Sequence, residues 1–154
     1  MDKQSSCLTC PLYGDGKGYV QDCLIPGATT LVLGQSPPTT DTRDTHFLPL
    51  AGLEKGVNVS IANVLKCKVT PGHDLQQAVE HCTKAYLVIP HEVSLVIADG
   101  EVAASWCAGQ RMETNRWRGH VLYPTRPGLP TTYAVQELSK VMKDPKGWYL
   151  AEID

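Results

Sequence analysis

Four of the six cysteines have the spacing of metal ligands. Cys7 and Cys10 form a C-x-x-C pair, and Cys67 and Cys82 follow far downstream. A C-x-x-C pair turns two thiolates toward one point, and two distant thiolates complete a tetrahedral set only where the chain folds back. Structural zinc usually takes two short knuckles, so this asymmetric spacing favours a cysteine-ligated 4Fe–4S cluster. Ordinary buried thiols, or a disulfide framework in a secreted protein, are the alternatives.

The length and the two ends of the chain indicate one intracellular domain, residues 1–154, with a cytoplasmic location. The 154 residues match one domain of ordinary size, and they contain no internal repeat or low-complexity linker. The N-terminus has no charged start followed by an apolar run, and no stretch is apolar over the length of a membrane helix. Disulfides are rare inside cells, so this context also favours a metal. Cys23 and Cys107 have no comparable partner and are interpreted as structural thiols.

The distribution of charge leaves nucleic-acid binding open. A net charge of -2 and a pI near 6.2 are not typical of a nucleic-acid-binding protein. One short stretch, which Glu113 alone opposes, nevertheless carries four arginines: Arg111, Arg116, Arg118 and Arg126. Such a stretch is either a solvated face or, around Trp117, a ridge that contacts phosphates.

The hydrophobic pattern alternates between strand-like runs and helix-like segments. Short apolar runs bounded by glycine or proline predict strands at 30–33, 57–65, 93–98 and 120–123. Amphipathic segments predict helices at 74–87, 101–107 and 132–142. Together they predict an α/β fold, a three-layer sandwich around a central, mostly parallel four-stranded sheet. Ligand sites in such sheets form in the loops at the carboxyl ends of the strands.

Five segments at this edge of the sheet resemble one known family. In order, they read C-L-T-C-P-L, L-V-L-G-Q-S-P-P-T-T-D, F-L-P-L-A-G, I-A-N-V-L-K-C and E-H-C. They resemble the iron-sulfur uracil-DNA glycosylases of family 4, which carry C-x-x-C-P-L, G-E-A-P-G-x-x-E, P-F-V-G-x-A-G, I-T-N-V-V-K-C and then a cysteine on the following helix. Order, spacing and all four cysteines agree over about the first half of the chain. Later, V-I-A-D-G-E-V-A-A and R-W-R-G-H are weaker likenesses to V-x-x-L-G-x-x-A-A and L-R-G-x-W.

The resemblance implies a uracil-DNA glycosylase-like domain that binds DNA and holds a 4Fe–4S cluster on Cys7, Cys10, Cys67 and Cys82. An enzyme of this kind flips a base into a pocket, stacks it on an aromatic ring and reads its edge. Phe47 matches the stacking aromatic and Asn63 the edge-reading amide, beside the turn that follows Gly34. From residue type alone, Phe47 is equally well a core residue and Asn63 a cap. The expected DNA contacts are Lys66, Lys68, Arg116 and Arg118 on phosphates, with Leu129 as the wedge.

Departures from the family pattern concern the catalytic residues. Gln35 stands where the family has an acid, and Asp41 takes the place of the second acid of that motif. Arg126-Pro127-Gly128 is the nearest match to the family's H-P-S, and His120 lies nearby in a predicted strand. The implied roles are therefore a dipole from Gln35, water positioning by Asp41 and stabilisation of the leaving uracil anion by Arg126. An arginine supplies charge there but exchanges no proton near neutral pH.

Two function classes follow from this pattern. The first is a DNA glycosylase that excises or recognises uracil, which retention of Phe47 and Asn63 favours. The second is a non-catalytic DNA-binding or replication-complex accessory subunit, which loss of the acid at Gln35 and of the H-P histidine favours. A generic metal-binding regulator is a distant third.

Overall fold

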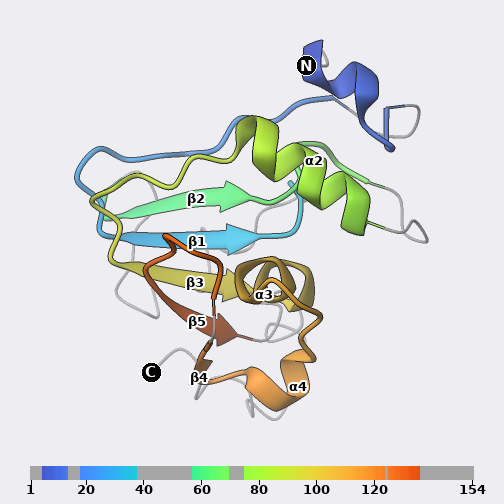
Figure 1. The fold of residues 1–154 in the computed structure, drawn as a ribbon. Coiled ribbons are helices and arrows are strands. Elements are labelled where there is room, and N and C mark those ends of the chain that lie inside the picture. The colour runs from blue at the N-terminus through green and yellow to red at the C-terminus, as the bar shows by residue number, and fades with distance from the viewer. Residues whose placement is uncertain (1–4, 14–17, 38–56, 70–74, 124, 136–154) are drawn as a thin grey trace, which may run out of the picture.

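A five-stranded mixed sheet organises the chain. The computed structural model describes residues 5–13, 18–37, 57–69, 75–123 and 125–135. Its strands are β1 (Thr30–Gly34), β2 (Val59–Asn63), β3 (Leu95–Asp99), β4 (His120–Val121) and β5 (Thr131–Val135). They lie in the order β2-β1-β3-β5-β4, with β2, β1, β3 and β5 parallel and β4 antiparallel at the edge (Figure 1). The predicted α/β class is confirmed, but the sheet is mixed and has five strands, not four.

The strands β1, β2 and β3 form where the sequence predicts them. Their residues are mostly β-branched or aliphatic, and β2 is buried along its whole length, as expected for a strand covered on both faces. The prediction of a helix at 132–142 is wrong in its described part, because Thr131–Val135 forms β5 beside β3. Its threonines, tyrosine and valine suit a strand, and the free edge of β3 offers it backbone partners. The segment at 120–123 contributes only the two residues of β4.

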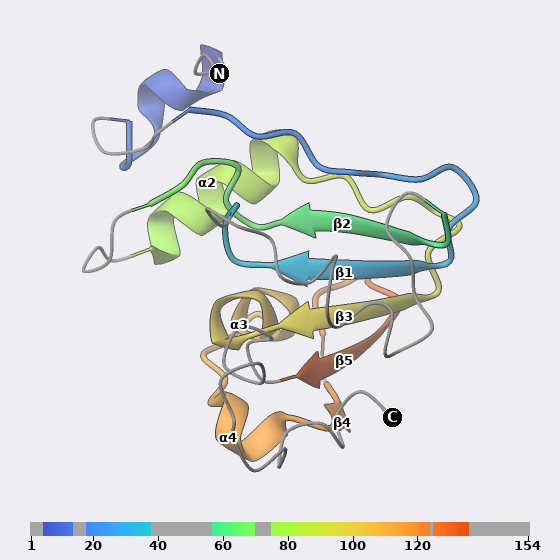
Figure 2. The same cartoon turned by 180° about the vertical axis from the view of Figure 1, so that it is seen from behind.

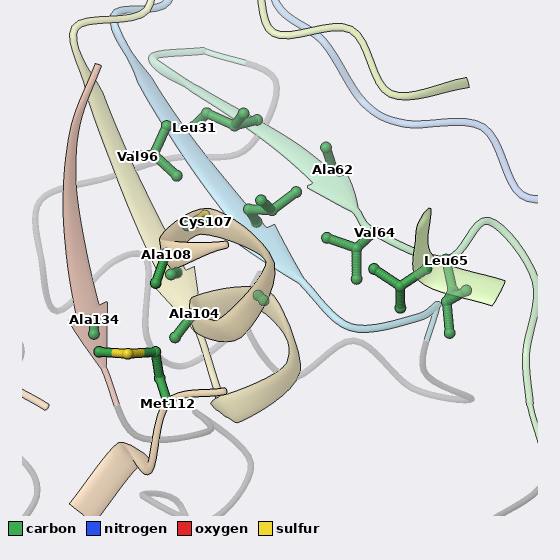
Figure 3. Packing of buried hydrophobic residues seen from close by; sticks show 14 of the residues in the cluster. Leu31, Ala62, Val64, Leu65, Val96, Ala104, Cys107, Ala108, Met112 and Ala134 are labelled. Carbon is green, nitrogen blue, oxygen red and sulfur yellow. The ribbon is translucent and has the colours of Figure 1, made fainter. Parts of the chain in front are cut away.

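Two helices, α2 (Gln76–Tyr86) and α3 (Glu101–Ala108), cover one face of the sheet. The other described helices are a short 3₁₀ helix η1 (Ser5–Thr9) and α4 (Thr114–Trp117). Figure 3 shows α3 with Ala104, Cys107 and Ala108 over the side of the sheet that carries Leu31 and Val96. Burial raises the pKa of the Cys107 thiol to about 12, in keeping with a structural role. No helix in the described ranges is long and apolar enough to cross a membrane.

The opposite face of the sheet has its own buried row. Val32, Val59 and Ile61 form a second cluster, against which Cys23 and Ile97 pack. Cys23 belongs to a segment that runs past the outer edge of β2 (Figure 2) and pairs antiparallel with Ile61. Both α2 and α3 pack on the first face, so the described part of the chain shows two of the three predicted layers.

Candidate functional site

Four cysteines from three separate segments line one hollow. Cys7 and Cys10 come from η1 and the residue after it, Cys67 from the chain leaving β2, and Cys82 from α2. All four are free thiols. The antiparallel bridge between Tyr19 and Cys67 helps bring the chain after β2 to this place. The structure therefore brings together the four residues that the spacing predicts as ligands.

The donor set of the hollow consists of four thiols. Among the described residues, no group of three or more His, Cys, Asp or Glu side chains is arranged to hold one metal ion. The other lining residues, most of them apolar or aromatic and one of them a lysine, are Leu12, Tyr13, Gly18, Tyr19, Leu65, Lys66, His81 and Tyr86. Four thiols and no carboxylate is a set typical of 4Fe–4S clusters, so the cluster stays a prediction that these residues fit.

Hydrogen-bond donors already face the sulfur atoms. The Leu12 N–H donates to Cys10 Sγ and the Lys66 N–H to Cys82 Sγ, each at 3.4 Å. The Tyr86 hydroxyl lies 3.9 Å from Cys7 Sγ. Burial raises the pKa of Cys82 to about 11, against the lowering effects of the Lys66 N–H and charge, and nearby Cys67 and Cys10 raise it further. A raised pKa favours the protonated thiol. A bound metal reverses this preference, since a coordinating thiol is deprotonated outright.

Lys66 is a structural cation at the end of β2. The prediction that it contacts phosphate is wrong, because its side chain is 2% exposed and its Nζ lies 2.6 Å from Asp22 Oδ2. The same Nζ donates to the Asn63 carbonyl, and Asp22 Oδ1 accepts the Asn63 N–H at 3.1 Å. With its own N–H bonded to Cys82 Sγ, Lys66 joins the thiol hollow to Asn63.

Asn63 and Gly34 lie side by side at the carboxyl ends of β2 and β1. They are partners in the parallel register, and the Gly34 carbonyl accepts the Val64 N–H at 2.9 Å. Asn63 is only 8% exposed, and its Oδ1 has no hydrogen-bond partner among the residues that the structure describes. Gln35 follows directly, with its side chain exposed and its carbonyl bonded to the Leu65 N–H. Asp41 and Phe47 lie outside the described residues.

Arg126 and Leu129 belong to another part of the molecule. Arg126 precedes β5, whereas Gly34 and Asn63 end strands that run parallel to β5, so Arg126 approaches from the opposite end of the sheet. Its guanidinium pairs with Glu80, donates to the Trp106 carbonyl and lies over the Trp106 ring at 5.1 Å. The structure therefore does not bring Arg126 together with Asn63, and its contact with a uracil anion stays a prediction. Leu129 packs against the main core instead of standing out as a wedge.

The remaining predicted DNA contacts lie at the opposite edge of the sheet from Asn63, except Lys68, which is half-buried next to Cys67. An open hollow at the edge formed by α4 and β4 is lined by Arg116, Trp117, His120 and Val121. The Gly119 N–H bonds the Ala134 carbonyl, so this edge lies near the carboxyl end of β5. Arg116 is exposed and Arg118 half-buried. We call the four lining residues the α4–β4 edge.

Sequence reasoning missed two carboxylates. Asp22 lies in a segment with no helix or strand pattern, and its partner Lys66 is 44 residues away, so no local signal pairs them. Asp99 ends β3 and is 9% exposed. The sequence does carry a signal for Asp99, because this residue follows an apolar run whose carboxyl end lies where ligand sites form.

Comparison with protein-family models and with curated proteins gives no match to this chain. Its function is therefore inferred from its own residues and their geometry.

Proposed function

We propose that this chain is a uracil-DNA glycosylase-like DNA-binding protein that recognises uracil and holds a 4Fe–4S cluster. The observation that carries the proposal is the buried Oδ1 of Asn63, which lacks a partner within the described ranges. An unpaired buried acceptor costs about 1–3 kcal/mol, so a ligand that brings an N–H donor is favoured here. Uracil offers a ring N–H beside a carbonyl, which matches the acceptor and donor of one amide. At the same ring position cytosine carries an acceptor instead of an N–H, so the Asn63 Oδ1 would stay without a hydrogen bond.

The cluster part of the proposal is supported by the four thiols around one hollow. A bound cluster would supply a covalent link between η1, the chain after β2 and α2. The residues of the chain prepare this link: the Leu12 and Lys66 N–H groups point at sulfur, and Lys66 connects the hollow to Asn63. Holding the cluster therefore also fixes the end of β2, where the base edge would be read.

DNA binding is supported by the α4–β4 edge. Arg116 and His120 offer cationic or titratable groups beside the indole of Trp117. Such a combination attracts the phosphate backbone by charge and stacks unpaired bases without reading sequence. Affinity would then arise at this edge, and base identity would be read at Asn63.

The decisive experiment is an excision assay on a single-stranded oligonucleotide with one uracil. Anaerobically purified protein is incubated with it, and alkali then cleaves any abasic site. Cleavage at the uracil position supports excision, and a cytosine oligonucleotide is the matched control. Intact uracil DNA that the protein still binds in preference to cytosine DNA would leave recognition without excision.

One observation favours a second candidate, a non-catalytic accessory subunit that binds DNA. The Arg126 guanidinium is engaged by Glu80 and Trp106, and Gln35 offers a dipole where the family has a carboxylate. In this case the protein binds single-stranded DNA with a steep salt dependence and equal affinity for uracil and cytosine. The same oligonucleotide pair therefore separates the two functions.

A further inference from the structure

Tyr123 is the most exposed of the large hydrophobic side chains in the described part of the chain, at 85%. It lies two residues beyond Val121, the last residue of β4, whose side chain is 53% exposed. Leu122 between them is buried, and its N–H donates to the Thr132 carbonyl at 2.8 Å, so the pairing with β5 continues past β4. Val121 and Tyr123 therefore face solvent on either side of a residue that belongs to the core.

The exposed ring of Tyr123 lies close in the chain to a cationic hollow. The α4–β4 edge lines an open hollow of about 610 Å³, to which Arg116 and His120 contribute. No acidic side chain is among the described residues that line it, and Glu113, the acid nearest to Arg116 in sequence, lies outside it. A single exposed tyrosine is common on protein surfaces, but an exposed ring beside cations suits a ligand that carries both phosphates and aromatic bases. The volume of the hollow is within the range of cavities that hold a ligand of nucleotide size.

The other aromatic side chain at this edge is less available to a ligand. Trp117 lines the hollow, but it is half-buried and packs against the main core. Tyr123 instead leaves nearly all of its ring accessible. A base that stacks on such a ring must be unpaired, since the faces of a base inside a duplex already contact the adjacent base pairs.

We propose that Tyr123 stacks on an unpaired base and so makes the α4–β4 edge a site for single-stranded DNA, an inference that rests on the proposed DNA binding. The charge of Arg116 attracts the phosphates of single-stranded and duplex DNA alike, so charge does not separate the two. Stacking does separate them, because a single strand presents the face of a base and a duplex does not. Affinity from charge and preference for single strands are therefore carried by different side chains.

The test compares Tyr123→Ala with wild type on three DNA molecules of equal length. They are a single strand, the same strand paired with its complement, and a single strand without bases. Anaerobically purified protein is used, and fluorescence anisotropy at low salt gives each dissociation constant. Tyr123→Ala should bind the single strand about fivefold or more weakly, and should bind the duplex and the strand without bases within about twofold of wild type. Because Tyr123 is exposed, the variant should stay folded by circular dichroism.

Two further variants test the reason for the loss. Tyr123→Phe keeps the ring and should bind the single strand within about twofold of wild type. Val88→Ala removes an apolar side chain that is 62% exposed between α2 and β3, and it should have no effect. Unchanged single-strand affinity in Tyr123→Ala, or an equal loss on the strand without bases, overturns stacking by Tyr123 and leaves DNA binding intact. A wild-type protein that binds none of the three DNA molecules overturns both the role of Tyr123 and the proposed function.

Discussion

Polar groups are buried at the end of β2 and exposed at the α4–β4 edge. At the end of β2, Lys66 and Asp22 are buried and paired, and Asn63 presents a buried acceptor. At the α4–β4 edge, Arg116 and His120 are exposed beside a hollow that is open to solvent. Buried groups discriminate, because a wrong partner leaves them unpaired, whereas exposed charges attract phosphate without regard to base. The end of β2 is therefore suited to recognising a base, and the α4–β4 edge is suited to binding the strand.

The largest effect on this comparison should come from the thiol hollow. Cys67→Ala or Cys82→Ala should abolish cluster binding and destabilise the end of β2, since the cluster would join segments far apart in sequence. Wild-type protein purified without oxygen should be brown and contain about four irons per chain. Cys23→Ala is the control, because Cys23 packs away from the hollow and should leave the iron content unchanged. A colourless wild type with one tightly held zinc would contradict the prediction.

Breaking the buried ion pair should have the next largest effect. Lys66→Met leaves the Asp22 carboxylate buried without its cation, which should lower the free energy of unfolding by about 3–5 kcal/mol. The double variant Asp22→Asn with Lys66→Met removes both charges and should recover part of that loss. Urea unfolding of the three proteins measures the difference. Unchanged stability in Lys66→Met would mean that the pair does not hold the end of β2.

Removing the Asn63 amide should affect only the discrimination between bases. Asn63→Ala should abolish the preference for uracil over cytosine, worth about tenfold or more in dissociation constant, because the hydrogen bonds to the base edge are lost. The dependence of binding on salt should stay as in wild type, since Asn63 carries no charge. Fluorescence anisotropy with the two oligonucleotides measures both quantities. A preference for uracil that survives in this variant would place base recognition elsewhere.

The smallest expected effect concerns one exposed charge. Arg116→Ala should reduce the slope of log affinity against log salt by about 0.7 for single-stranded DNA, because one phosphate contact is lost. The ratio of uracil to cytosine affinity should not change. Arg111→Ala is a matched control, since Arg111 faces Glu101 at 3.8 Å and lies outside the α4–β4 edge. Equal slopes of log affinity against log salt in Arg116→Ala and wild type would show that this edge does not contact the DNA.

The strands β1, β2 and β3 were predictable from the sequence, because apolar runs bounded by glycine are a strong local signal. The helical assignment of 132–142 failed because Thr131–Val135 combines helix-like spacing with a strand position set by the free edge of β3. Because β5 is parallel to β1 and β2, Arg126 before it lies at the opposite end of the sheet from Asn63. Local matching of short motifs therefore depends on assigning the strands correctly.

The cysteines and Asn63 could be selected from the sequence, because their spacing and neighbours carry the signal. The role of Lys66 could not, because a lysine is almost always exposed unless a partner is buried with it, and Asp22 lies far away in sequence. The pairing of Asn63 with Gly34 required the register of two strands, which no local pattern gives.

The most direct test of the account measures affinity for two single-stranded oligonucleotides over a range of salt. They differ in one base, cytosine or uracil, each on a 2′-fluorinated deoxyribose, whose fluorine slows cleavage of the glycosidic bond during the measurement. The account predicts that both affinities fall together as salt rises, while uracil stays favoured by about tenfold or more at every concentration. Equal affinities for the two oligonucleotides at all salt concentrations would contradict uracil recognition by this protein.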